Sequence, residues 1–269
     1  AYIEGCKDGD KLKRALSGAL HAGKPVVVTK NGRTNLGARA AASHTAALAG
    51  DDAVYDALFK QYGVIRAYTI DEFFNVGQAL SKWPVRPANH NLAIISISGG
   101  VGALMADEAD ENRLSLPAPP DAVKARLLAR IPFAGANNPV DVTGHALTDL
   151  SILLDTSRDL LGTGNYGAFA IFLAAAGSSE TLWPYLQELV EVLHTEHPHI
   201  RLTISALLPP ERKNTLQKNG AMVFADPSVA IRTLSRIMHH QPAMIPAVTS
   251  GQPSVSLPES VGALDEAGS

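Results

Sequence analysis

The chain has 269 residues, enough for one large domain or two ordinary ones. Its 23 Lys and Arg nearly balance 26 Asp and Glu, so the chain lacks the basic excess of proteins that bind nucleic acid or membrane surfaces. Apolar residues make up 46%, which excludes global disorder, and the single cysteine, Cys6, excludes a disulfide framework and a thiolate metal cluster.

The first predicted element is a truncated strand: we interpret the opening residues AYIEG as the last residues of a strand whose start is missing. Periodicity then predicts a helix over 9–21, a strand over 24–30, a helix over 51–62, a strand over 64–67 and a helix over 71–82. The segment 83–91 has two prolines and no period. We therefore expect a partial first domain over 1–84 and a linker over 85–91.

The second half repeats this alternation. We expect strands at 92–98, 166–175, 201–208 and 221–225, and helices at 101–112, 119–130, 147–161, 180–196, 210–219 and 227–240. Alternating strands and helices predict right-handed crossovers, a parallel sheet and the α/β fold class. We expect a domain over 92–240 and an exposed linker over 241–269, where proline, serine and glycine replace periodic apolar residues.

The first segment with chemical potential is SISGGVGALMAD, 96–107. A buried strand runs into Ser98, Gly99 and Gly100, and a helix begins near Val101. Free amides at a helix start favour phosphate or carboxylate, and ligands of parallel sheets bind at the carboxyl ends of strands. The alternative is a tight turn in which glycine only permits the geometry.

A second segment, 30–50, places small residues around His44, with Arg33 before it and Ser43 and Thr45 beside it. It lacks the bulky residues of a structural helix, so we interpret it as a closely approachable loop whose imidazole can attack a phosphoryl group. The alternative is a surface histidine.

Two further segments carry weaker signals. Glu4 could orient an imidazole or be a solvated acid at a strand end. The stretch 137–145, with Asn138 and Asp141, suggests an ordered loop that either contacts a ligand or only forms Asx turns. The remaining histidines have no acidic or cysteine partner at metal-binding spacing, so we assign no metal site.

Together, YIEG, KPVVVTKNGRTNLGARAAASHTAALAGDDAVYDALFKQYGVIR, LAIISISGGVGALMAD and NNPVDVTG occur in the order and spacing of one family. Over about residues 1–240, the chain resembles the NDP-forming (ADP-forming) acyl-CoA synthetases, which are related to succinyl-CoA synthetase. The resemblance implies two flavodoxin-like domains, the first truncated at its N-terminus. It also implies a relay in which His44 carries a phosphoryl group, Glu4 holds that histidine, and the turn at Ser98, Gly99 and Gly100 faces the phosphate.

The resemblance has departures. Ala46 replaces a glycine after SHT, and the glycine turn is shorter than in many relatives. The family's CoA-binding and ATP-grasp domains are absent from these residues, so we expect an internal fragment with no tightly bound cofactor. CoA, acyl phosphate or acyl-CoA, ATP or ADP, and Mg²⁺ would be substrates or metal of the complete enzyme.

Three expectations concern partners and location. No apolar run reaches the roughly 20 residues of a membrane span and no leader is recognisable, so we expect a cytoplasmic protein. An exposed strand edge in the first domain predicts a homo-oligomer. The alternative function, from another class, is a ligand-sensing region of a protein lysine acetyltransferase, against which the presence of His44 argues.

Overall fold

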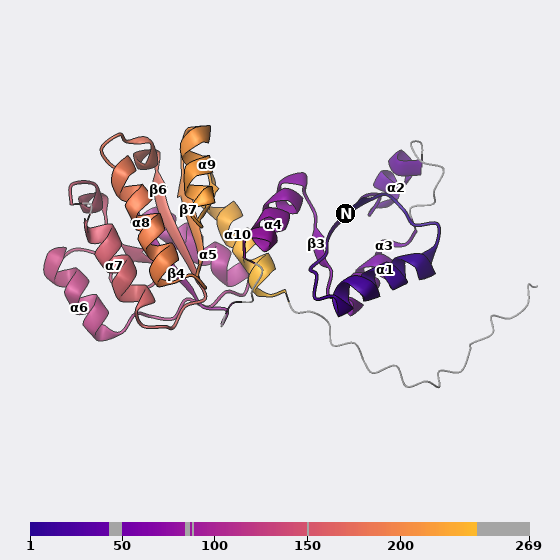
Figure 1. Cartoon of the computed structure of the whole chain (residues 1–269), viewed down its shortest axis with the longest axis horizontal. Coiled ribbons are helices and arrows are strands. Elements are labelled where there is room, and N and C mark those ends of the chain that lie inside the picture. The colour runs from indigo at the N-terminus through magenta and orange to yellow at the C-terminus, as the bar shows by residue number, and fades with distance from the viewer. Residues whose placement is uncertain (43–49, 84–86, 88, 150, 241–269) are drawn as a thin grey trace, which may run out of the picture.

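The computed structural model describes residues 1–42, 50–83, 87, 89–149 and 151–240, which form two parallel sheets with helices around them (Figure 1). The first unit contains strands β1 (Tyr2–Ile3), β2 (Val27–Lys30) and β3 (Ile65–Ala67), in the order β1-β2-β3. The opening residues therefore form a short strand, which pairs in parallel with β2.

The described part of this unit also contains the helices α1 (Gly9–His21), α2 (Asn35–Ala42), α3 (Asp52–Gln61) and α4 (Ile70–Lys82). The side chains of Asp8, Asp51 and Thr69 accept first-turn amides and so fix where α1, α3 and α4 begin. Leu16 of α1 and Phe59 of α3 pack on Val28 of the sheet, which forms a small core.

The second unit contains β4 (Leu92–Ser96), β5 (Val140–Asp141), β6 (Ala168–Ala174), β7 (Arg201–Ala206) and β8 (Met222–Phe224). In the described residues their order is β5-β4-β6-β7-β8, all parallel. Numbered within this unit, the order is 2-1-3-4-5, that of flavodoxin-like sheets. The predicted α/β class and flavodoxin-like order are confirmed.

Helices cover both faces of this sheet (Figure 1). They are α5 (Gly99–Glu111), α6 (Asp121–Arg130), α7 (Ser151–Leu161), α8 (Trp183–Glu196), α9 (Pro210–Lys218) and α10 (Pro227–Met238), with short 3-10 turns at Gly144–Leu147 and Ala175–Ser178. One core cluster joins one sheet face to α6, α7 and α8, and a second joins the other face to α5 and α10. Because successive side chains along each strand point to opposite faces of the sheet, they contribute to two separate cores.

Helix α4 connects the two units. Val76 and Ala79 of α4 are fully buried in the same cluster as Ile231 of α10 and Ile65 of β3 (Figure 1). An ion pair between Glu72 and Arg236, at 2.6 Å, lies at the same junction. The two units are therefore packed on each other, beyond the covalent linker.

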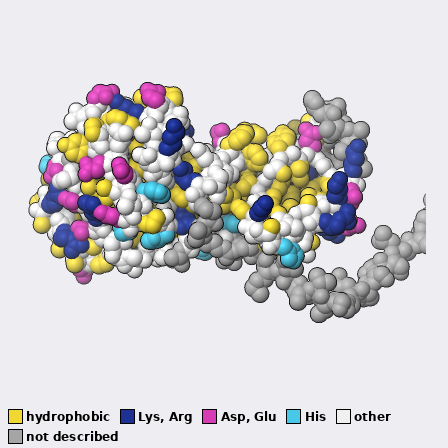
Figure 2. All heavy atoms as spheres, in the orientation of Figure 1, with side chains coloured by type: hydrophobic (Ala, Val, Ile, Leu, Met, Phe, Trp, Pro, Cys, Tyr) yellow, Lys and Arg dark blue, Asp and Glu magenta, His cyan; other side chains and the backbone are white. Residues whose placement is uncertain are grey.

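The first unit also exposes apolar surface, which gathers on its visible face in Figure 2. Its large apolar residues that are more than half exposed are Tyr2, Leu36, Val54, Ile70 and Phe74. Such surface is typical of contact with another protein surface.

Three local predictions were wrong. Residues 35–42, which we expected to be loop, form α2, because alanine-rich sequence favours a helix even when its side chains bury nothing. Residues 140–141, expected in a loop, form the two-residue strand β5, which depends on pairing with β4. Helix α5 begins at Gly99 rather than near Val101.

Candidate functional site

The glycine turn lies at the carboxyl end of β4. Ser98 precedes α5 with extended backbone angles (φ −144°, ψ 116°), and its side chain makes no bond to the first-turn amides. Instead, the Ser96 hydroxyl donates to the Ser98 carbonyl at 2.7 Å and accepts from the Ser98 amide at 3.0 Å. Gly99 and Gly100 are exposed. Solvent therefore reaches the N-terminal, positive end of α5, and the Ser98 side chain does not occupy the backbone amides of the first turn.

Asp141 is adjacent to this turn. It pairs with Ser96 across the β4–β5 ladder, and a Cβ added to Gly99 would lie 2.8 Å from Asp141 Oδ2. The other carboxylate oxygen, Oδ1, accepts the Thr143 amide at 2.8 Å. The structure thus brings together Asp141 and the glycine turn, and only glycine fits at position 99 without displacing the carboxylate.

Asn138 supports the sheet. Its Oδ1 accepts the Ile94 amide at 3.0 Å, and its Nδ2 donates to the carbonyls of Leu92 at 2.8 Å and Pro117 at 3.1 Å. These bonds continue the ladder of β4 with a side chain. The Asn138 side chain therefore stabilises the backbone around β4. Its contact with a ligand stays a prediction.

Two strained residues flank the glycine turn, and the sequence offered no signal for them. Thr143 follows β5 with φ 56° and ψ −178°, and Ala174 ends β6 with φ 48° and ψ −133°. Their strands lie on either side of β4. Positive φ costs a non-glycine residue energy, and such residues cluster at functional sites. The gap between β4 and β6 is also where chain order reverses in a flavodoxin-like sheet, the usual ligand position.

The segment centred on His44 lies outside the described residues, together with Ser43 and Thr45. The structure describes both of its flanks. On the N-terminal side, β2 ends at Lys30 and α2 ends at Ala42. On the C-terminal side, Gly50 has a φ of +67° and packs against Tyr55, so that a Cβ added to Gly50 would lie 3.0 Å from the Tyr55 ring.

Glu4 lies at the same sheet edge as the start of this segment. It follows β1 directly, and the Asn31 amide donates to the Ile3 carbonyl at 2.9 Å. Glu4 is half-buried. The predicted contact between Glu4 and His44 lies outside the described residues, but the described residues place Glu4 beside the chain that leads to His44.

Sequence reasoning missed a set of buried charges behind this edge. Lys30 is 2% exposed, its ammonium lies 4.8 Å from the centre of the Tyr55 ring, and it donates to the Asn31 carbonyl. Burial lowers the pKa of Lys30. Arg66, 8% exposed, pairs with Asp52 and with Asp56 at 3.3 Å. Charged residues at strand ends look solvated in a sequence, so only the packing of α3 identifies them as buried.

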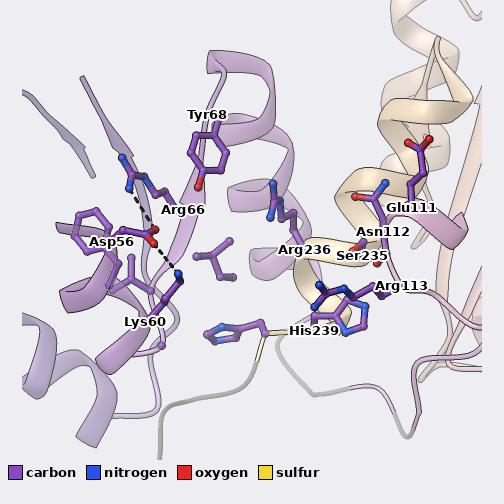
Figure 3. A pocket seen from close by; sticks show the side chains of 15 residues that line it. Asp56, Lys60, Arg66, Tyr68, Glu111, Asn112, Arg113, Ser235, Arg236 and His239 are labelled. Carbon is purple, nitrogen blue, oxygen red and sulfur yellow. Dashed lines mark hydrogen bonds and ion pairs between the residues drawn. The ribbon is translucent and has the colours of Figure 1, made fainter. Parts of the chain in front are cut away.

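A cavity of about 600 Å³ lies between the units rather than at the glycine turn (Figure 3). It is bordered by the C-terminal ends of α3, α5 and α10 and by β3. Its charged and polar lining residues include Asp56, Lys60, Arg66, Tyr68, Glu111, Arg113, Arg236 and His239.

The described ranges contain neither a metal-binding cluster nor a membrane-spanning helix. No group of three or more His, Cys, Asp or Glu side chains there could hold a metal ion. No helix there is long and apolar enough to cross a bilayer.

Comparison with known proteins places this geometry in context. Residues 1–80 match the model of the succinyl-CoA ligase like flavodoxin domain. The chain is 35% identical over 243 residues to the α subunit of acetate–CoA ligase [ADP-forming] I from Pyrococcus furiosus, covering 88% of this chain and 51% of that protein. It is 39% identical over 147 residues to 4-hydroxybutyrate–CoA ligase [ADP-forming] from Nitrosopumilus maritimus, covering 54% of this chain and 21% of that one.

A solved structure is similar over the same range. The dinucleotide forming acetyl-coenzyme A synthetase 1 of Ca. Korarchaeum cryptofilum, in complex with phosphate and ADP, superposes with a TM-score of 0.73 at 27% identity. The match covers 88% of this chain and 51% of that one. The chain thus spans about half the length of the Pyrococcus and Korarchaeum proteins.

Proposed function

We propose that this chain, which is similar to members of the NDP-forming acyl-CoA synthetase family, supplies the phosphohistidine-bearing core of an acid–thiol ligase of that family. The reaction interconverts acyl-CoA, ADP and phosphate with a carboxylic acid, CoA and ATP. The observation that carries this proposal is the uncapped, exposed start of α5 at the carboxyl edge of a flavodoxin-like sheet. The similar Korarchaeum structure was solved with phosphate and ADP.

The proposed relay has three balanced steps. A phosphate oxygen attacks the thioester carbonyl, the C–S bond breaks, and CoA leaves with acyl phosphate as the product. A ring nitrogen of His44 then attacks phosphorus, so that a P–N bond forms while the P–O bond to the carboxylate breaks. Finally, a β-phosphate oxygen of ADP takes the phosphoryl group and His44 is released.

The start of α5 has a defined part in this relay. The amides of Gly99, Gly100 and Val101 spread partial positive charge over several donors. They stabilise the phosphoryl group without a formal cation, so the group can still leave. Asp141, which borders this turn, disfavours a second anion on its side and thereby restricts where the phosphate lies.

Glu4 is proposed to orient His44. A carboxylate that accepts one ring N–H fixes the tautomer and leaves the other nitrogen free to attack phosphorus. Its position beside the chain leading to His44 supports this assignment. Arg33, Ser43 and Thr45 are proposed contacts of the same loop.

The remaining parts of the relay need partners. A CoA-binding domain and an ATP-grasp domain would supply the thioester and nucleotide sites, and Mg²⁺ would accompany the nucleotide. The exposed apolar surface of the first unit is consistent with such contacts. A cytoplasmic location and a homo-oligomer stay predictions. The acid is undefined, since the relatives include ligases for acetate and for 4-hydroxybutyrate.

The alternative, a non-catalytic sensing region of a protein lysine acetyltransferase, is not favoured, because the relatives named above are ligases. One experiment separates the two. Full-length protein incubated with ATP labelled in the γ-phosphate should acquire acid-labile, base-stable label at His44, and His44→Asn should not. Ligand binding without label in the wild type would support the sensing function and overturn ours.

A further inference from the structure

We infer that Tyr68 is a positioning residue. It holds Arg33, at the start of the His44-bearing segment, in a fixed position relative to the second unit. This inference rests on the proposed function and adds a residue to it. Tyr68 directly follows β3 at its carboxyl end and is 42% exposed.

Three guanidinium groups surround the Tyr68 ring. Their Cζ atoms lie 4.9 Å (Arg33), 5.3 Å (Arg66) and 5.7 Å (Arg236) from its centre. All three distances are within the range of attraction between a cation and an aromatic face. Figure 3 shows Tyr68 at the edge of the cavity, with Arg66 on one side and Arg236 on the other. The three arginines come from three segments that are distant in the sequence.

Two of these arginines are also held by carboxylates. Arg66 pairs with Asp52 and Asp56, and Arg236 Nε donates to Glu72 Oε1 at 2.6 Å. The other oxygen of Glu72 accepts the Tyr68 amide at 2.8 Å. A single carboxylate therefore ties the backbone of Tyr68 to α10 of the second unit.

Arg33 differs from the other two. Within the described part of the chain no carboxylate pairs with Arg33, and its guanidinium contacts the Tyr68 ring. The ring fixes the guanidinium by its face alone and leaves the N–H donors at its edge free to meet an anion. Removing the ring should release Arg33 while leaving Arg66 with its two carboxylates.

The consequence is a defined spacing between the two halves of the proposed site. Arg33 lies in the stretch that leads to His44, and α10 packs on the sheet whose β4 ends at the glycine turn. Tyr68 contacts both sides. It acts through these neighbours rather than on the phosphoryl group itself.

The test compares Tyr68→Leu, which removes the ring, with Tyr68→Phe, which keeps it. Tyr185→Leu is the matched control, because Tyr185 of α8 is 51% exposed and has no part in this cluster. The first readout is hydrogen–deuterium exchange of residues 31–42, which needs no activity. We expect exchange about fivefold faster in Tyr68→Leu only, the change expected for losing one such contact.

The second readout is the single-turnover rate of phosphoryl transfer from His44 in the full-length protein. We expect this rate to be about fivefold slower in Tyr68→Leu and unchanged in Tyr68→Phe, while the steady-state KM for the acid, measured separately, stays at the wild-type value in both. Arg33→Gln should also be slow, and the double variant with Tyr68→Leu no slower than the slower single one.

The inference is overturned by unchanged exchange and rate in Tyr68→Leu, by equal losses in Tyr68→Phe, or by additive effects in the double variant. Absence of phosphate on His44 in the wild type would refute the proposed function instead. In that case the exchange measurement still decides the role of Tyr68.

Discussion

Alanine at position 99 tests the geometry of the glycine turn that is proposed to face the phosphate. Gly99 and Gly100 are consecutive first-turn residues of α5, and neither has a positive φ, so alanine is conformationally allowed at both. A Cβ at position 99 would lie 2.8 Å from Asp141 Oδ2, whereas a Cβ at position 100 would meet nothing within 4 Å. The two substitutions are therefore chemically identical and differ only in what the methyl group contacts.

The expected free energies of unfolding follow from these contacts. Alanine is favoured over glycine in a helix by up to about 1 kcal/mol, so Gly100→Ala should be neutral or stabilising. Gly99→Ala makes a contact closer than atoms tolerate and displaces Asp141 from the Thr143 amide. Losing the hydrogen bond from the Thr143 amide to this carboxylate costs about 1–3 kcal/mol, which should make Gly99→Ala the less stable variant by about that amount.

Urea denaturation at neutral pH, followed by circular dichroism, measures the difference. Repeating both substitutions in an Asp141→Ala background removes the obstructing carboxylate, so the two alanines should then have the same effect. A coupling energy of about 1–3 kcal/mol between positions 99 and 141 is expected. Equal stabilities of Gly99→Ala and Gly100→Ala, or additivity with Asp141→Ala, would refute the described geometry.

Three more predictions follow from the same contacts. Gly100→Ala should fold normally but slow phosphoryl transfer through His44 by about tenfold or more, because its methyl group obstructs the approach of the phosphoryl group to the amides of α5. The control is Gly18→Ala in α1, where an added methyl group also meets nothing within 4 Å. Equal transfer rates in the two variants would contradict this prediction. The hydrogen bond from Lys60, and then Arg66, lowers the pKa of Asp56, so its ionised form stabilises the fold above its ordinary pKa of 3.8 and this contribution is lost as pH falls through the lowered value. The stability gap between wild type and Asp56→Asn, measured by urea denaturation, should therefore close in acid, and a constant gap would argue against the ion pair. Burial lowers the pKa of Lys30 below its ordinary 10.5, so keeping Lys30 charged costs stability at neutral pH. The stability of the wild type relative to Lys30→Met should therefore rise as pH increases through that lowered pKa toward 10.5, and a flat or falling difference would contradict the burial.

Sequence patterns predicted the large elements because those elements are determined locally. The continuous apolar run that forms β4 is typical of a strand buried on both faces, and it is fully buried in the structure. The amphipathic period of residues 9–21 likewise predicted α1 at its observed bounds. The flavodoxin-like order came from the family resemblance, since strand order is not encoded in any one segment.

The missed features depend on contacts between distant segments. Strand β5 has two residues and exists because Ser96 and Ile95 of β4 pair with it. The strain at Ala174 has no signal in the residue type, because alanine normally avoids positive φ. The cluster around Tyr68 unites three segments through ring and guanidinium contacts, which become visible only when the units are packed together.

The central claim, that His44 carries a phosphoryl group between acyl phosphate and nucleotide, is tested most directly by a chase of isolated phosphoprotein. Labelled full-length protein is divided between ADP alone and acetate with CoA, and the products are separated. A relay through His44 should give labelled ATP in the first portion and labelled inorganic phosphate with an equal amount of acetyl-CoA in the second. The label should be lost from His44 in both. Should acetate not be accepted, other short-chain acids replace it in the second portion. Label that stays on the protein under both chases, or that appears equally in His44→Asn, would contradict phosphoryl transfer through His44.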